Sequence, residues 1–142
     1  MTYFKSLLIN CLVVFFVNHV IPGLEIAYYT KLPHVGGELI FAFGLGFLNS
    51  LIFPVLYFFQ FSPSHFKIGL ISGVVSFGAY SIVNLLPVGI RITTGGAYIW
   101  SSLIVWFVSY LTNHLEYKRY LAKIEAKYDK KNKEDEDEDL KK

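Results

Sequence analysis

Few residues in this chain have the types and spacing that metal chemistry requires. His34 and Glu38 lie four residues apart, and His19 and Glu25 precede them, so a zinc site can be drawn from these four side chains. The Gly36-Gly37 pair argues against one continuous helix through His34 and Glu38, and a histidine-rich ligand spacing is absent. The sequence therefore predicts no metal site and no cofactor.

Nucleophilic catalysis has as little support. Serines are plentiful, but a serine triad also needs a histidine and an acid to orient it. Before Asn113 the only acidic residues are Glu25 and Glu38. The single Cys11 lies in the first apolar run and has no intrachain partner. We therefore expect a protein that is not an enzyme, and we expect no nucleic acid as a partner.

The distribution of charge decides the class of protein. Four windows carry no formal charge: 19 residues after Lys5, 28 after Glu38, 23 after Lys67 and 24 after Arg91. About 20 mostly apolar residues cross the hydrocarbon core, and in lipid the backbone must bond within its own segment. A soluble helical core would show a polar face on each helix, and these windows lack one. The sequence predicts an all-α integral membrane protein whose partner is the lipid bilayer.

The four windows predict four transmembrane helices in one domain, residues 1–113. Pro22-Gly23 ends the first span, and Pro54 inside the second predicts a kink that neighbouring helices tolerate. A cleaved signal peptide is the alternative for the N-terminus, but no small-residue cleavage site follows Ile21. The expected spans are approximately residues 4–21, 38–61, 67–86 and 97–113.

The cytoplasmic side follows from the basic residues. With four spans, both termini share one side with the turn before Lys67, and 11 of the 13 Lys and Arg residues lie there. The other side carries only Lys31 and Arg91. Because basic loops stay in the cytoplasm, we expect both termini to be cytoplasmic.

The C-terminal segment changes character after Asn113. Residues 114–131 alternate apolar and aromatic with basic residues at helical spacing, which predicts a basic amphipathic juxtamembrane helix. Four basic side chains are candidates for contact with anionic lipid headgroups, although a simple topology anchor explains them equally well. These are Lys118, Arg119, Lys123 and Lys127. Residues 132–142 contain an unbroken acidic run, which predicts a disordered charged tail.

An internal repeat relates the two halves. Residues 17–26 and 83–92 share Val, Asn, Gly and a final Ile at an offset of 66, and residues 36–40 resemble residues 95–99 after a short gap. These matches predict two helical hairpins that are parallel repeats about an axis along the membrane normal. Such an axis would place Leu24-Glu25-Ile26 antiparallel to Ile90-Arg91-Ile92, so we expect them to pair as a small ribbon, with Glu25 near Arg91.

Three motifs resemble the four-span holin-like membrane protein family, which comprises phage holin superfamily IV and its bacterial chromosomal relatives. The resemblance covers about Leu7 to Leu111 and implies a bacterial or phage-derived inner-membrane protein. Family members commonly carry a basic residue before the second-span proline, where this chain has Phe53. The motifs are Leu7-Leu8-Ile9-Asn10, the residues from Val20 to Ile26, and those from Gly44 to Leu56.

Polar and small residues inside the spans are the remaining candidate contacts. Four asparagines are expected to form interhelical polar contacts, with a polar conduit as the alternative. These are Asn10, Asn18, Asn49 and Asn84. Small residues in spans two and three predict close helix packing, within one molecule or in a homo-oligomer.

The leading hypothesis is a non-enzymatic, holin-like inner-membrane protein with a role in envelope permeability or stress. One alternative is a small channel or transporter subunit, although the absence of mid-span charges argues against proton-coupled or ion-coupled transport. The other is a membrane scaffold that recruits a cytoplasmic partner through its charged tail.

Overall fold

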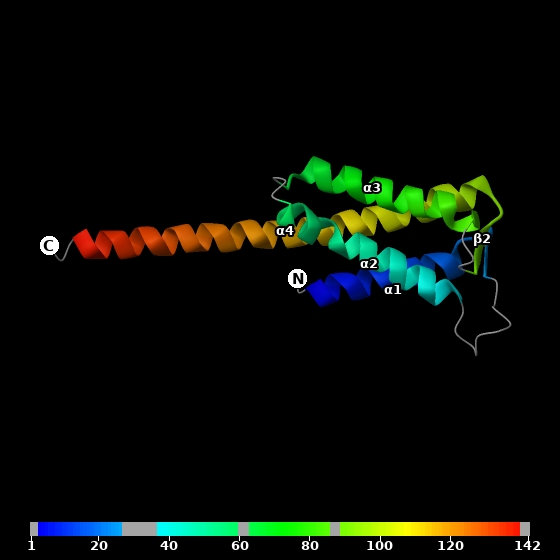
Figure 1. Ribbon diagram of the computed structural model, residues 1–142, viewed down its shortest axis with the longest axis horizontal. Coiled ribbons are helices and arrows are strands. Elements are labelled where there is room, and N and C mark those ends of the chain that lie inside the picture. The colour runs from blue at the N-terminus through cyan, green and yellow to red at the C-terminus, as the bar shows by residue number, and fades with distance from the viewer. Residues whose placement is uncertain (1–2, 27–36, 60–62, 86–88, 140–142) are drawn as a thin grey trace.

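Four helices and a two-stranded ribbon make up the part of the chain that the structure describes (Figure 1). The structure is a computed structural model, and it describes residues 3–26, 37–59, 63–85 and 89–139. In chain order the elements are α1 (Tyr3–Val20), β1 (Leu24–Ile26), α2 (Gly37–Phe58), α3 (His65–Ile82), the 3-10 helix η1 (Val83–Leu85), β2 (Ile90–Ile92) and α4 (Gly95–Asp139).

Among the described helices, three are long and apolar enough to cross a membrane: α1, α2 and the segment from His65 to Leu85. The first part of α4, expected as the fourth span, is not among them. Its hydropathy is lowered by hydroxyl and amide side chains that face the other helices and are buried, whereas its outer face exposes Ile99, Trp100 and Phe107. A span whose polar side is covered by protein is less apolar in composition than one that faces lipid on most sides.

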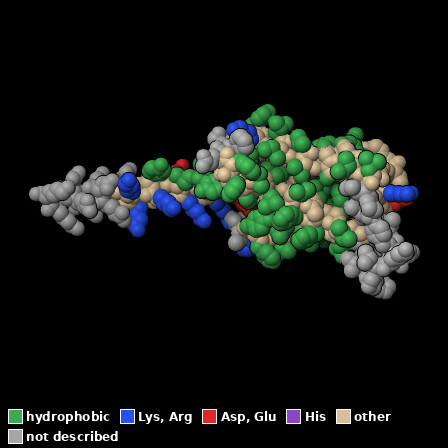
Figure 2. Space-filling view, in the orientation of Figure 1, with side chains coloured by type: hydrophobic (Ala, Val, Ile, Leu, Met, Phe, Trp, Pro, Cys, Tyr) green, Lys and Arg blue, Asp and Glu red, His purple; other side chains and the backbone are tan. Residues whose placement is uncertain are grey.

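The helices run alternately along one bundle (Figure 1). α1 and α3 end at the ribbon, α2 and α4 run away from it, and the two chain ends lie toward the opposite end of the bundle. α1 packs most extensively on α2, and α3 on α4. Hydrophobic side chains are spread over the whole length of the bundle face that Figure 2 shows, while Lys and Arg side chains gather at its ends and along the extension of α4. This distribution suits a bundle surrounded by lipid.

The ribbon forms as expected. β1 pairs antiparallel with β2, and the pairs are Leu24 with Ile92, Glu25 with Arg91, and Ile26 with Ile90. Glu25 and Arg91 therefore oppose each other in register, although their side chains form no ion pair in the described part of the chain.

A glycine with positive φ precedes each strand of the ribbon. Gly23 has φ 92° and Gly89 has φ 74°, a region that favours glycine because it has no Cβ. The two glycines are 66 residues apart, the same offset that separates Glu25 from Arg91. The backbone therefore turns into both strands in the same way.

Burial recurs at fixed offsets along paired helices. At an offset of 66, the buried residues Ser6, Asn10, Val14 and Val17 of α1 correspond to Ser72, Ser76, Tyr80 and Val83, which are also buried. Most buried residues of α4 correspond to buried residues of α2 at an offset of 60, for example Val105 to Leu45. This offset differs by one residue from the glycine-based match of residues 36–40 with 95–99. Superposition of the hairpins stays a prediction.

α4 differs from its expected division into span, juxtamembrane helix and disordered tail. It is one continuous helix of 45 residues, so the expected disorder of residues 132–142 was wrong as far as Asp139. Helix propagation costs little once a helix is nucleated, and Lys and Glu are good helix formers. Figure 1 shows the second half of α4 projecting beyond the bundle.

The other boundaries lie close to the expected ones. α1 matches the first span to one residue, α2 ends at Phe58, short of residue 61, and α3 begins two residues before the expected Lys67. Pro54 lies inside α2 as expected, and the kink there stays a prediction.

A close approach of α1 and α2 generates the first prediction. A Cβ added at Gly46 would lie 2.6 Å from the backbone nitrogen of Cys11, whereas one added at Gly44 meets nothing within 4 Å. We expect Gly46→Ala to destabilise the bundle by about 1–3 kcal/mol, because the two backbones must separate. Thermal unfolding in detergent measures this, with Gly44→Ala as the matched control. Equal midpoints for the two variants would contradict the close approach.

Candidate functional site

The candidate site is the polar interior of the bundle. Small polar side chains from all four helices are buried where the helices meet, beside an apolar core that includes Val14, Leu45 and Tyr80. Backbone and side-chain groups in this interior have no lipid partner, so they bond to one another or to water. The buried serine, threonine and asparagine residues are Ser6, Asn10, Asn18, Asn49, Ser50, Ser72, Ser76, Ser101, Ser102, Ser109, Thr112 and Asn113.

One polar contact joins α1 to α4. The Nδ2 of Asn10 donates to Thr112 Oγ1 at 3.1 Å and to the carbonyl of Ser6 at 3.0 Å. Thr112 Oγ1 in turn donates to the carbonyl of Ser109 at 3.0 Å. Asn10, one of the four expected asparagines, thus makes a side-chain bond between helices.

A second contact clamps α2 from α4. Asn113 Nδ2 donates to the carbonyl of Asn49 at 2.8 Å, and the backbone N–H of Phe53 donates to Asn113 Oδ1 at 2.9 Å. Asn49 and Phe53 are four residues apart, so one side-chain amide holds both backbone groups of one turn. This turn immediately precedes Pro54, where the α2 ladder lacks a donor.

Asn113 was not among the asparagines expected from the sequence. The sequence feature that could have identified it is the spacing of Ser102, Ser109 and Asn113, at i, i+7 and i+11, which places the three on one helical face. In the sequence Asn113 marked only the end of a span.

The other three asparagines differ in their partners. Asn18 Oδ1 accepts from the Tyr80 hydroxyl of α3 at 3.1 Å. Asn84 instead bonds to β2, donating to the carbonyl of Ile92 at 3.1 Å and accepting from its N–H at 2.8 Å. The side-chain amide of Asn84 therefore bonds to the backbone of β2 as a neighbouring strand would. The amide of Asn49 is fully buried, and neither of its polar atoms has a partner in the described residues.

Several buried hydroxyls are also unpaired in the described part of the chain. The Oγ atoms of Ser72, Ser76, Ser102 and Ser109 are examples. Buried polar atoms are normally satisfied, and water supplies the missing bonds where protein does not. These hydroxyls are therefore polar groups of the interior that the described side chains leave without a hydrogen bond.

Charged and ionisable groups lie at the two ends of this interior. Near the ribbon, His19 Nε2 lies 3.6 Å from Glu38 Oε1. Near the other end, burial raises the pKa of Glu116 above its ordinary value, which favours a neutral carboxyl. No group of three His, Cys, Asp or Glu side chains suited to a metal occurs among the described residues, and His34 lies outside them.

A histidine pair lies at the same end as Glu116, on the outer side of the α3–α4 hairpin. The Nδ1 atoms of His65 and His114 are 2.8 Å apart, so one ring donates to the other. Burial lowers the pKa of His114, and the neighbouring His65 and Lys118 lower it further. His114 therefore favours its neutral form.

The four basic candidates for headgroup contact lie along the extension of α4. Lys118 and Arg119 are exposed and follow Asn113 by five and six residues, which places them within about 9 Å along a helix. Lys127 lies about 21 Å from Asn113 on the same measure. The headgroup layer is only about 5–8 Å thick on each side, so contact at Lys123 and Lys127 requires the helix to tilt.

Comparison with known proteins gives one family. Residues 1–111 match the family of mycobacterial 4 TMS phage holins, superfamily IV. The chain belongs to this family. No curated protein and no solved structure matches this holin-family chain significantly. The match supports a multi-pass membrane protein, confirms the resemblance inferred from the motifs, and ends before the polar clamp at Asn113 and the long extension of α4.

The clamp of α2 by α4 generates the second prediction. We expect Asn113→Leu to lower the stability of this holin-family protein by about 1–2 kcal/mol. Two interhelical hydrogen bonds are lost, and each contributes about 0.6 kcal/mol inside a membrane protein. The backbone N–H of Phe53 and the carbonyl of Asn49 are then left to bond with each other. Unfolding in mixed micelles measures the change. Leu115→Ala, on the exposed outer face, is the control, and an Asn113→Leu midpoint equal to wild type would show that the clamp stabilises nothing.

Proposed function

We propose that this holin-family protein is a non-enzymatic component of a bacterial inner membrane that changes the permeability of the bilayer through its packed helices. The unpaired polar atoms in the bundle interior carry this proposal. The interior is mixed, because these polar atoms lie beside an apolar core that includes Val14, Leu45 and Tyr80. Water that enters between the helices can bond to the unpaired hydroxyl and amide atoms, which lowers the cost of parting the helices at these positions.

The proposed arrangement is a four-span bundle made of two duplicated hairpins. The family supports four spans, and the offset of 66 shared by Glu25 with Arg91 and by Gly23 with Gly89 supports the duplication. A two-fold axis that passes between Glu25 and Arg91 would superpose each strand on the other, N-terminus on N-terminus. Two strands related in this way run antiparallel, as β1 and β2 do. A homo-oligomer formed through the outer faces is part of this proposal.

Orientation forms the third prediction. We propose that both termini are cytoplasmic, because 11 of the 13 basic residues lie at their end of the bundle. A reporter that is active only in the cytoplasm should be active when fused after Lys142, and a periplasmic reporter at the same site should be inactive. An inactive cytoplasmic reporter together with an active periplasmic reporter would show the opposite topology.

Dye leakage from vesicles that contain the purified protein is the fourth prediction and tests the permeability function. We expect release of an encapsulated fluorescent dye as well as dissipation of a proton gradient, since a bundle that parts along its polar seams passes solutes without selecting them. Ala residues in place of Ser72, Ser76 and Ser109 should slow both processes together. Proton flux without dye release would favour the channel or transporter subunit, and no flux of either kind would reject a permeability function.

A scaffold is the second candidate, and the extension of α4 favours it. This helix continues beyond the bundle to Asp139 and carries basic residues followed by an acidic run. Removal of residues 130–142 separates the two functions. A deletion that leaves both the leakage and the cellular phenotype intact supports the permeability function, whereas a phenotype lost in cells with normal insertion and normal leakage supports recruitment of a partner.

A further inference from the structure

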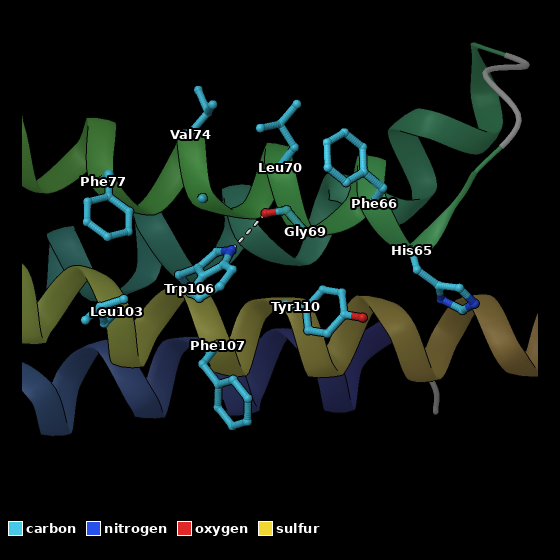
Figure 3. A pocket seen from close by; sticks show the side chains of 11 residues that line it. His65, Phe66, Gly69, Leu70, Val74, Phe77, Leu103, Trp106, Phe107 and Tyr110 are labelled. Carbon is cyan, nitrogen blue, oxygen red and sulfur yellow. Dashed lines mark hydrogen bonds between the residues drawn. The ribbon is translucent and has the colours of Figure 1, made fainter.

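The outer surface of the α3–α4 hairpin contains a groove that the proposed permeability function does not use (Figure 3). Its volume is about 1030 Å³, and none of the residues that line it is acidic. Leu70, Val74 and Phe107 are exposed on it and provide apolar walls. The groove opens outward, where a bundle in a bilayer meets lipid.

At the centre of the groove floor, the indole N–H already has a hydrogen-bond partner. Trp106 lies across it, and its Nε1 donates to the carbonyl of Gly69 at 2.8 Å, the bond drawn in Figure 3. Gly69 and Gly73 have no side chains, so the rings of Tyr110 and Trp106 lie close against α3, where an added Cβ would be 3.5 Å and 3.4 Å from them. Because its indole donor is already satisfied, this stretch accepts a hydrocarbon chain without leaving a buried polar group unpaired.

One end of the groove is polar and basic. His65 lines this end, and Tyr110 points its hydroxyl toward it in Figure 3. His114 contacts both, bonding to His65 and stacking on Tyr110 with ring centroids 5.6 Å apart. Lys118 lies one turn further along α4, close enough to lower the pKa of His114. This end lies beside the termini, at the level where a span leaves the hydrocarbon.

The length of the groove distinguishes its occupants. Phe77 lies 12 positions after His65 on α3, which corresponds to about 18 Å along the helix. One leaflet contributes about 15 Å of hydrocarbon, whereas a transmembrane helix from a second copy needs about 30 Å of surface. The groove thus has the length of an acyl chain from one leaflet, with its polar end at the headgroups.

We propose that this groove is a binding site for one anionic phospholipid from the leaflet on the side of the termini. An acyl chain lies along Gly69 and Gly73, and the headgroup phosphate is bound by the Lys118 ammonium and by the one ring N–H that the bond between His65 and His114 leaves available. A charged donor gives a phosphate its strongest hydrogen bonds, and a basic residue near an anionic headgroup contributes favourably. The site requires only that the bundle lies in a bilayer, and it does not depend on whether the protein conducts solutes.

Native mass spectrometry of the full-length protein, released from bilayers that contain equal amounts of phosphatidylglycerol and phosphatidylcholine, tests this fifth prediction. We expect one phosphatidylglycerol to be retained per protein. Gly73→Leu should lower its retention by at least about fivefold by filling the groove, and Gly78→Leu, on the same helix where a Cβ meets nothing within 4 Å, should not. Retention that is equal in both glycine variants and wild type would overturn the site.

The charge of the headgroup is tested separately. Lys118→Gln should reduce phosphatidylglycerol retention about fivefold, the factor that corresponds to ~1 kcal/mol per basic residue, and should leave phosphatidylcholine retention unchanged. Lys131→Gln, about 20 Å further along α4, is the control. Equal losses of both lipids in Lys118→Gln would contradict recognition of the headgroup.

A photoreactive residue at Leu70 distinguishes lipid from protein. Crosslinks to phospholipid support the proposal, and crosslinks that yield a covalent dimer in place of a lipid adduct assign the groove to a second copy and overturn it. Retention measured after addition of excess inorganic phosphate should not change, because the acyl chain contributes to binding. Displacement by phosphate alone would show an anion site without a lipid.

Discussion

Polar groups inside a bilayer can bond only to one another or to enclosed water, and the architecture of this protein follows from that constraint. The backbone must be helical where it crosses, and the side chains between the helices must carry their own partners. Asn10 and Asn113 meet this need in two ways, one by bonding a threonine of another helix and one by bonding backbone groups. The buried hydroxyls that have no described partner mark where pairing is incomplete. The stability of the bundle therefore depends in part on a small set of polar groups.

The two halves of the bundle share a backbone plan but differ in chemistry. At an offset of 66, Ser6 and Asn10 correspond to Ser72 and Ser76. Asn10 has a hydroxyl partner on α4, whereas the hydroxyls of Ser72 and Ser76 have none in the described residues, and α3 packs against Ile52 and Leu56 of α2. One seam between the hairpins is thus bonded and the other is not. The contact between α2 and α3 is instead held by apolar side chains, namely Ile52, Leu56 and Ile68.

Much of the fold was predictable from the sequence because bilayer thickness and charge distribution constrain it strongly. Charge-free windows located α1 and α2 to within a few residues, and the repeated segment around Glu25 and Arg91 predicted both the ribbon and its register. The polar partners were less predictable, because they depend on how each helix is rotated about its axis. Asn113 illustrates this, since its bonds to α2 follow from a helix–helix orientation that no local pattern specifies. The continuation of α4 is not evident from the sequence. An acidic run favours disorder through charge repulsion, whereas an existing helix propagates into it at little cost.

The unbroken course of α4 has a mechanical consequence. The same helix that carries Thr112 and Asn113 in the bundle continues to Asp139, about 39 Å beyond Asn113 at the usual rise per residue. A rod of this kind transmits rotation and tilt without a joint. A tilt of α4 about the Asn113 clamp would move each point of the extension in proportion to its distance from the clamp. The extension thus acts as a lever arm, through which a load applied outside the membrane bears directly on the Asn113 clamp.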